Sequence, residues 1–174
     1  IGALAYKVFS LFDADISLVF VLAFIPLFFY ASCVVFFFLT CRELKINNYI
    51  VFISSIFFSL SPIFLQRSAF GWYDTDPYNV LIPLIALFLM IKIVSSNVDR
   101  IALVLALSLT SGIYALIWQG WLFIAILISI SFAVAAISSA LMGISPARHI
   151  RQLFLYLIGT IFMAIIFLTP RGAA

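Results

Sequence analysis

Long apolar runs dominate this 174-residue chain and limit the folds open to it. Hydrophobic residues make up 67% of the sequence and charged residues only 9%, against about 25% charged residues in a typical soluble domain. Several runs approach or exceed the roughly 20 apolar residues needed to cross a bilayer. Too little polar surface remains to coat a water-soluble particle. The sequence therefore predicts an all-α integral membrane protein, a polytopic bundle of transmembrane helices.

Short polar links divide the apolar sequence into about six predicted helices within one transmembrane domain over residues 1–174. These helices cover residues 16–40, 49–65, 78–94, 101–117, 122–142 and 153–168, with a loop over 66–77. Pro26 lies inside the first helix, where neighbouring helices can satisfy the carbonyl that it frees, so we expect a kink there. Pro77 stands near the first turn of the third helix, where a missing N–H costs little. We expect further sequence beyond both ends of the chain.

Basic residues predict the orientation of these helices in the membrane. The links after the first, third and fifth helices share one side and carry Arg42, Lys45, Lys92, Arg100, Arg148 and Arg151. The side richer in Lys and Arg is cytoplasmic, so the loop over 66–77 is expected to face outward. Scattered cations of this kind are typical of topology signals and do not indicate a nucleic-acid partner. Cys33 and Cys41 have neither the spacing of a metal site nor that of a disulfide framework.

Residues 70–79, Phe-Gly-Trp-Tyr-Asp-Thr-Asp-Pro-Tyr-Asn, form a polar island between two apolar runs. Asp74 and Asp76 lie one residue apart, and two ionised carboxylates this close repel each other unless a cation binds them. Their hard oxygens suit Mg²⁺ or Mn²⁺, and such a metal can act as a Lewis acid on a phosphate leaving group. Arg67 could pair with a carboxylate or a phosphate. A purely structural role, with Asp74 capping the next helix and Asp76 solvated, stays open on spacing alone.

In its wider context this loop resembles the second external loop of the oligosaccharyltransferase catalytic subunit, in its bacterial single-subunit form. That loop runs Arg, a small residue, Gly, two aromatics and Asp-Thr-Asp, and here Arg67-Ser68 precede Gly71-Trp72-Tyr73-Asp74-Thr75-Asp76. The stretch 112–121, GIYALIWQGW, is similar to the family's aromatic-rich turn between its fifth and sixth helices. The resemblance spans nearly the whole chain. It implies that the predicted helices are transmembrane helices two to seven of the C-type membrane glycosyltransferase fold.

The resemblance implies an enzyme that transfers an oligosaccharide from a polyprenyl (pyro)phosphate carrier to Asn in Asn-X-Ser/Thr, with Mn²⁺ or Mg²⁺ as cofactor. Its partners would be the lipid-linked oligosaccharide, an acceptor polypeptide and membrane lipid. Asp74 would be a direct metal ligand, Asp76 a ligand or support, and Arg67 would orient a carboxylate or contact the pyrophosphate. Trp118, with Tyr114 nearby, would line the groove for the lipid-linked donor. The Asp-Thr-Asp form suggests a bacterial inner membrane with the active face on the periplasmic side.

Two other functions stay open at this point. A different polyprenyl-phosphate-dependent membrane glycosyltransferase, such as an O-mannosyl or lipid A sugar transferase, usually has its acidic pair in the first external loop. A transporter or flippase segment would carry charges inside its helices, and the helices predicted here carry none in their interior. Neither Asp13 nor Asp15 matches the family's first-loop Asp, and its later Glu and Trp-Trp-Asp-Tyr-Gly motif are not among these residues. We therefore expect this chain alone to be inactive.

Overall fold

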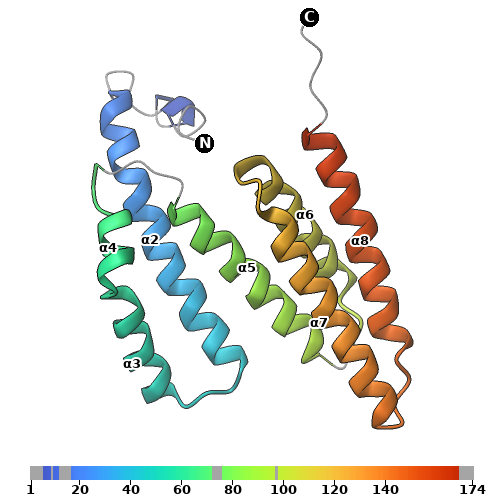
Figure 1. Cartoon of the computed structure of the whole chain (residues 1–174). Coiled ribbons are helices and arrows are strands. Elements are labelled where there is room, and N and C mark those ends of the chain that lie inside the picture. Colours follow the sequence, from blue (N-terminus) through green and yellow to red (C-terminus); the bar gives the residue numbers. More distant parts are fainter. Residues whose placement is uncertain (1–5, 9, 12–16, 72–75, 97, 169–174) are drawn as a thin grey trace, which may run out of the picture. The chain divides into compact units, whose positions relative to one another are not determined.

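The protein consists of helices joined by short links in the part that the structure, a computed structural model, describes (Figure 1). That part comprises residues 6–8, 10–11, 17–71, 76–96 and 98–168. The helices are α2 (Leu18–Glu43), α3 (Asn48–Ser59), α4 (Pro62–Arg67), α5 (Asp76–Val94), α6 (Ile101–Ile117), α7 (Trp121–Leu141) and α8 (Ala147–Leu168). Within these ranges there is no strand, and four of the helices, α2, α5, α7 and α8, are long and apolar enough to cross a membrane. The predicted fold class, an all-α membrane bundle, is confirmed.

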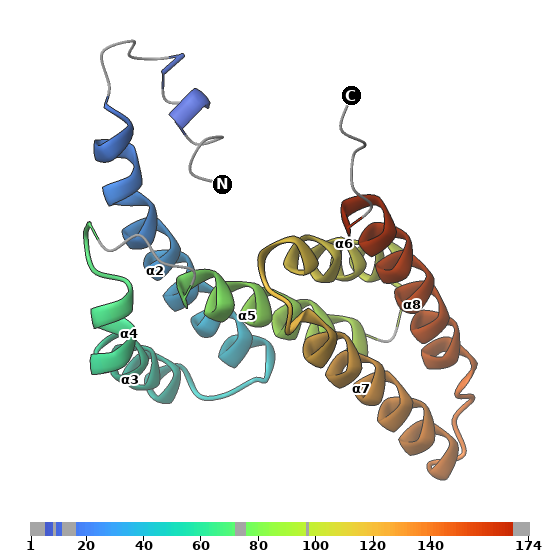
Figure 2. The same cartoon turned by 45° about the horizontal axis from the view of Figure 1, so that its top comes forward.

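The chain divides into two compact units, Ile1–Leu81 and Ile82–Ala174, with the boundary inside α5. In the first unit α3 packs beside α2, as both Figure 1 and Figure 2 show. In the second unit α6 and α7 pack against α8. Because few side chains on lipid-facing helices need burial, many large apolar side chains on α2, α7 and α8 are exposed. This pattern is expected when acyl chains complete the packing.

One predicted helix is broken in the structure. The sequence predicted a continuous helix over 49–65, but α3 ends at Ser59 and a new helix, α4, begins at Pro62. Pro62 has no N–H for the carbonyl four residues earlier and its ring would clash with that carbonyl, so the first helix cannot pass through it. At the first position of α4 the same residue is favourable. The hydroxyl of Tyr30 on α2 donates to the Ser59 carbonyl at 2.7 Å, which satisfies one acceptor that the break exposes.

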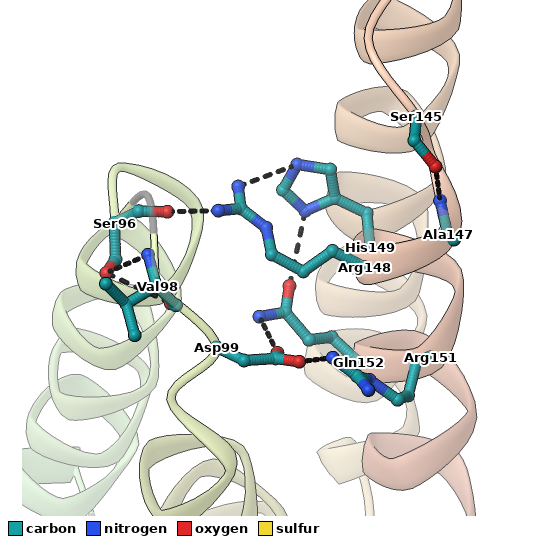
Figure 3. Close-up of polar contacts among 9 residues, drawn as sticks. All are labelled: Ser96, Val98, Asp99, Ser145, Ala147, Arg148, His149, Arg151 and Gln152. Atoms are coloured by element: carbon teal, nitrogen blue, oxygen red, sulfur yellow. Dashed lines mark hydrogen bonds and ion pairs between the residues drawn. The ribbon is translucent and has the colours of Figure 1, made fainter.

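The last helix begins earlier than the sequence predicted. Residues 143–152 were expected to form a link, but α8 starts at Ala147, whose N–H contacts the hydroxyl oxygen of Ser145 at 3.4 Å. The helix can extend into this polar stretch because its side chains find partners on the link between α5 and α6. Gln152 Nε2 donates to Asp99 Oδ1 at 3.1 Å, and both links therefore lie at the same end of the second unit (Figure 3).

Two helices end in the same hydrogen-bonded motif. Lys45, with φ 58°, and Gly143, with φ 72°, follow α2 and α7 at equivalent positions in a left-handed conformation. The bonds that define the motif are Lys45 N–H to Arg42 O at 2.9 Å, Ile46 N–H to Cys41 O at 3.3 Å, Gly143 N–H to Ala140 O at 3.0 Å and Ile144 N–H to Ser139 O at 2.8 Å. This is the Schellman arrangement, which glycine adopts without strain and lysine does not.

A buried cluster holds the second unit together. Its members come from four helices and are Ala86, Met90, Ile93, Val104, Leu107, Ile128, Phe132 and Tyr156. The closest seam lies between α6 and α8, where the Ser108 hydroxyl contacts the Tyr156 carbonyl at 3.2 Å and the Ser111 hydroxyl contacts the Tyr156 hydroxyl at 2.9 Å. Small residues on both helices permit this approach, as is usual where packing rather than hydrophobic burial joins membrane helices.

Candidate functional site

An ion pair connects the two sides of the predicted loop over 66–77, the acidic loop. Arg67 Nη1 lies 3.2 Å from Asp76 Oδ2. Arg67 ends α4 and Asp76 begins α5, so the pair closes the segment between the two helices at its base. The two side chains are 49% and 42% exposed. Solvent therefore screens the pair, and both groups remain accessible to a ligand.

The start of α5 holds the carboxylate of Asp76 at a positive helix end. Asp76 lies in the first turn of α5, where the unpaired backbone N–H groups favour a negative charge. The next two residues fix this turn against α2, because the Tyr78 ring lies 4.4 Å from that of Phe29 and the Cys33 thiol lies 3.7 Å from the Pro77 carbonyl. Asp76 is thus placed by packing on α2 as well as by its partner Arg67.

The loop that follows α4 is anchored to α2. Gly71 has φ 83°, a conformation that side-chain-bearing residues rarely adopt, and its N–H donates to the Ala23 carbonyl at 3.2 Å. The Phe70 ring meets the Phe24 ring edge-on at 5.0 Å. The predicted metal ligand, Asp74, lies outside the described residues together with Trp72, Tyr73 and Thr75. The structure therefore describes the two ends of the acidic loop and their attachment.

A groove opens beside the ion pair in the first unit. It has a volume of about 420 Å³, within the size range of small-molecule sites. Its lining residues come from α3, α4 and α5 and from the break between α3 and α4, and they are Phe58, Ser61, Ile63, Phe64, Arg67, Asp76, Asn79 and Val80. One part of the lining is apolar and the rest offers a cation, a carboxylate, an amide and a hydroxyl. This composition suits a ligand with a polar group and an apolar portion.

Stacked aromatic rings form the apolar wall of this groove. The Phe58 and Phe64 rings lie 5.0 Å apart. Phe58 stacks on Phe37 at 4.6 Å, and Phe64 stacks on Tyr30 at 5.0 Å. Because Tyr30 and Phe37 belong to α2, the wall is tied to the longest helix of the unit. Sequence reasoning did not identify this wall, although the Phe-rich composition of the apolar runs was visible.

Tyr114 and Trp118 lie at the end of α6 in the second unit. Tyr114 is buried, with 1% of its surface exposed, while Trp118 is 43% exposed. Their rings are 5.6 Å apart, and the indole lies over Gly120, where a Cβ would overlap it. Trp118 therefore presents a supported aromatic surface and Tyr114 supports it from within. Their role toward a lipid-linked donor stays a prediction.

The oxygen groups at the start of α5 suit a hard divalent cation in their chemistry. Asp76 and Asn79 lie three residues apart on one face of the helix, and both line the groove. Carboxylate and amide oxygens are ligands of Mg²⁺ and Mn²⁺. Across the ranges that the structure describes, no group of three or more His, Cys, Asp or Glu side chains could hold a metal. A complete ligand set would thus need Asp74 or groups from elsewhere.

Comparison with known families identifies the chain. A family model described as "Oligosaccharyl transferase STT3, N-terminal" matches residues 1–172. The chain belongs to the STT3 family. No curated protein and no solved structure matched it. As a member of the STT3 family, with four helices among its described residues that are long and apolar enough to cross a membrane, it is an integral membrane protein of the oligosaccharyltransferase type, a class of membrane glycosyltransferases.

Family membership confirms the resemblance that the loop and the aromatic turn had indicated. In general terms, the STT3 family implies a lipid-linked oligosaccharide and an acceptor protein as partners. Asn79 lines the groove beside Asp76 and was not among the site residues that the sequence predicted. Its spacing of three residues from Asp76 at the start of a helix is the signal that could have found it, because residues so spaced share one helix face.

Proposed function

We propose that this chain forms part of the catalytic membrane face of an oligosaccharyltransferase for protein N-glycosylation. The donor is a glycan on a polyprenyl (pyro)phosphate carrier, and the acceptor is the side-chain amide of Asn in Asn-X-Ser/Thr. The ion pair between Arg67 and Asp76 at the edge of an apolar groove carries the proposal. It brings a phosphate-binding type of cation and a metal-binding type of carboxylate together beside a surface that fits a lipid.

Asp74 and Asp76 are the residues that would hold Mn²⁺ or Mg²⁺. Bound there, the metal would supply Lewis acidity toward a phosphate leaving group. Arg67 pairs with Asp76 and would orient its carboxylate, and a guanidinium is a group type that also binds phosphate oxygens. The positive end of α5 favours negative charge at the same place. Trp118, supported by Tyr114, offers an aromatic surface for the donor lipid.

The charge distribution supports a compartment for this proposed reaction. Cations gather in the links on the side opposite the loop over 66–77, so this loop faces away from the cytoplasm. In a bacterium that face is the periplasmic side of the inner membrane. Membership of the oligosaccharyl transferase family favours N-glycosylation over O-mannosyl or lipid A sugar transfer.

The test uses the full-length protein that carries this chain, purified in detergent. Transfer from a lipid-linked oligosaccharide to an Asn-X-Thr peptide is measured with Mn²⁺, with a chelator, and with a Gln-X-Thr peptide. We expect transfer only with metal and the Asn peptide, and its collapse in Asp74→Asn. Glu43→Gln, which removes a carboxylate at the C-terminal end of α2, is the matched control. Undiminished transfer in Asp74→Asn would reduce Asp74 to a helix cap, and no transfer from several donor lipids would refute the proposed reaction.

A further inference from the structure

Cations gather at one end of the second unit, where the link between α5 and α6 meets the start of α8. We define the basic rim as Lys92, Arg100, Arg148 and Arg151. The carboxylate described at this end is that of Asp99. Four cations and one carboxylate leave this end strongly positive, and the proposed transfer reaction uses none of them.

Two guanidinium groups of the basic rim converge on a single residue. Arg148 Nη1 donates to the Ser96 carbonyl at 2.5 Å, and Arg100 Nε donates to the Ser96 hydroxyl at 3.0 Å. In the described part of the chain neither arginine pairs with a carboxylate. Like charges held close together repel, and more strongly where a membrane lowers the dielectric constant. An anion between them would remove this repulsion and accept from the N–H groups that the Ser96 contacts leave over.

The nearby carboxylate is already committed to other partners (Figure 3). Asp99 Oδ1 accepts from Gln152, which is fully buried, and Oδ2 pairs with Arg151. Because Arg148 can only donate, its 3.1 Å contact makes His149 Nε2 an acceptor, so Nδ1–H donates to Gln152 Oε1 at 3.2 Å. This chain of hydrogen bonds holds Arg148 in place without neutralising it.

Large apolar side chains are exposed at the same end. Val98 is 68% exposed on the link after α5, while Leu141, Met142 and Ile144 at the end of α7 are 85%, 73% and 59% exposed. Both α7 and α8 are apolar enough to cross a membrane, so this end lies at a membrane boundary. Cations beside exposed apolar side chains match a layer of headgroups over acyl chains rather than a dissolved ion.

We propose that Arg100 and Arg148 bind the phosphodiester of an anionic phospholipid at the basic rim. The exposed side chains of Met142 and Ile144 then lie among its acyl chains. Guanidinium groups suit this role because their planar N–H groups match phosphate oxygens in pairs. The cytoplasmic leaflet, on which the charge distribution places this end, is where anionic lipids concentrate. The site is independent of the transfer reaction.

Native mass spectrometry of the protein purified in detergent tests this site. Phosphatidylglycerol and phosphatidylcholine are added at equal concentration, and the lipid retained by the protein is compared. We expect several-fold more phosphatidylglycerol, and loss of that preference in R100Q/R148Q. R42Q/K45Q removes the same charge at the link after α2 and should keep the preference. Equal retention of both lipids by the unmodified protein, or an unchanged preference in R100Q/R148Q, overturns the proposal.

Two additions keep the result decisive. Arg100 is exposed and its contact is with Ser96, so Arg100→Gln alone leaves the Arg148 contacts intact and should still lower the preference if the double variant folds poorly. Excess inorganic phosphate distinguishes the source of the anion. If phosphate stabilises the protein against heat as strongly as phosphatidylglycerol does, and Arg100→Gln removes that stabilisation, then the site takes dissolved phosphate and the lipid assignment is wrong. A lipid preference that persists in excess phosphate supports it.

Discussion

Arg67 at the end of α4 pairs with Asp76 at the start of α5, with 3.2 Å between Nη1 and Oδ2. The pair spans the acidic loop and fixes the distance between its two ends. It also lies at the edge of the groove that α3, α4 and α5 line. A contact between half-exposed groups contributes little to stability. The main effect of this ion pair is therefore to position the Asp76 carboxylate.

Substitution of Arg67 is expected to separate positioning from stability. Arg67→Gln should change the free energy of unfolding by less than about 1 kcal/mol, because the pair is screened by solvent. Transfer by the full-length protein should fall at least roughly tenfold, because misplaced groups at a reacting centre lose that much or more. Arg67→Lys keeps the charge but loses the planar guanidinium group. Its transfer rate should lie between those of the unmodified protein and Arg67→Gln.

The measurement is transfer rate against Mn²⁺ concentration for each variant. A misoriented Asp76 predicts a higher Mn²⁺ requirement as well as a lower rate. Arg42→Gln removes the same charge in the last turn of α2 and is the control. Equal activity of Arg67→Gln and Arg42→Gln would show that the ion pair is structural only.

The Schellman motifs after α2 and α7 give a matched pair of stability predictions. Lys45 adopts φ 58° where glycine is favoured, so Lys45→Gly should stabilise the protein by roughly 0.5–1 kcal/mol, net of the entropy that glycine adds to the unfolded chain. A Cβ added at Gly143 would meet open space, but φ there is 72°, so Gly143→Ala should destabilise by about 1 kcal/mol through backbone strain alone. Unfolding in detergent, followed by circular dichroism, measures both changes, and a loss of stability in Lys45→Gly would contradict the argument.

The seam between α6 and α8 should be intolerant of one added methyl group. A Cβ at Gly159 would lie 2.7 Å from the Ser108 hydroxyl oxygen and 2.8 Å from its Cβ. Gly159→Ala is therefore expected to destabilise by about 1–3 kcal/mol, and Ser108→Gly in the same protein should recover part of that loss. Ile158→Ala, at a neighbouring position that is 65% exposed, is the control in the same unfolding measurement. A small loss of stability in Gly159→Ala, with no recovery when Ser108→Gly is added, would mean that the two helices pack less closely.

The sequence predicted the membrane fold because that fold depends on local composition. Apolar runs near the length of a bilayer can only be helices, and the loop stands out as polar residues between two such runs. The break at Pro62 also had a local signal, since a Ser-Pro pair inside an apolar run disfavours a continuous helix. The apolar run over 49–65 is long enough for a single helix, and this length led to the prediction of a continuous one.

Other features of the structure could not be predicted from the neighbouring sequence. Gln152 and Asp99 are 53 residues apart, so neither position indicates that one bonds the other. That bond lies in the first turns of α8, in the stretch where the sequence predicted a link. Likewise, Tyr114 is buried and Trp118 exposed, although both lie in one aromatic-rich stretch. Which aromatic faces outward is decided by how α6 packs in the second unit, and composition carries no such information.

Gln152 provides the sharpest test of the hydrogen-bond chain at the start of α8. It is fully buried, and its amide bonds His149 on one side and Asp99 on the other. Gln152→Met keeps the shape of the side chain but removes both bonds, so it should destabilise by about 1–3 kcal/mol for each polar group left unsatisfied. Gln119→Met makes the same change at an exposed position and should shift stability by less than about 0.5 kcal/mol. Similar unfolding curves for the two variants would show that this chain of hydrogen bonds adds nothing to stability, whereas a selective loss in Gln152→Met would show that a partner 53 residues away stabilises the start of α8.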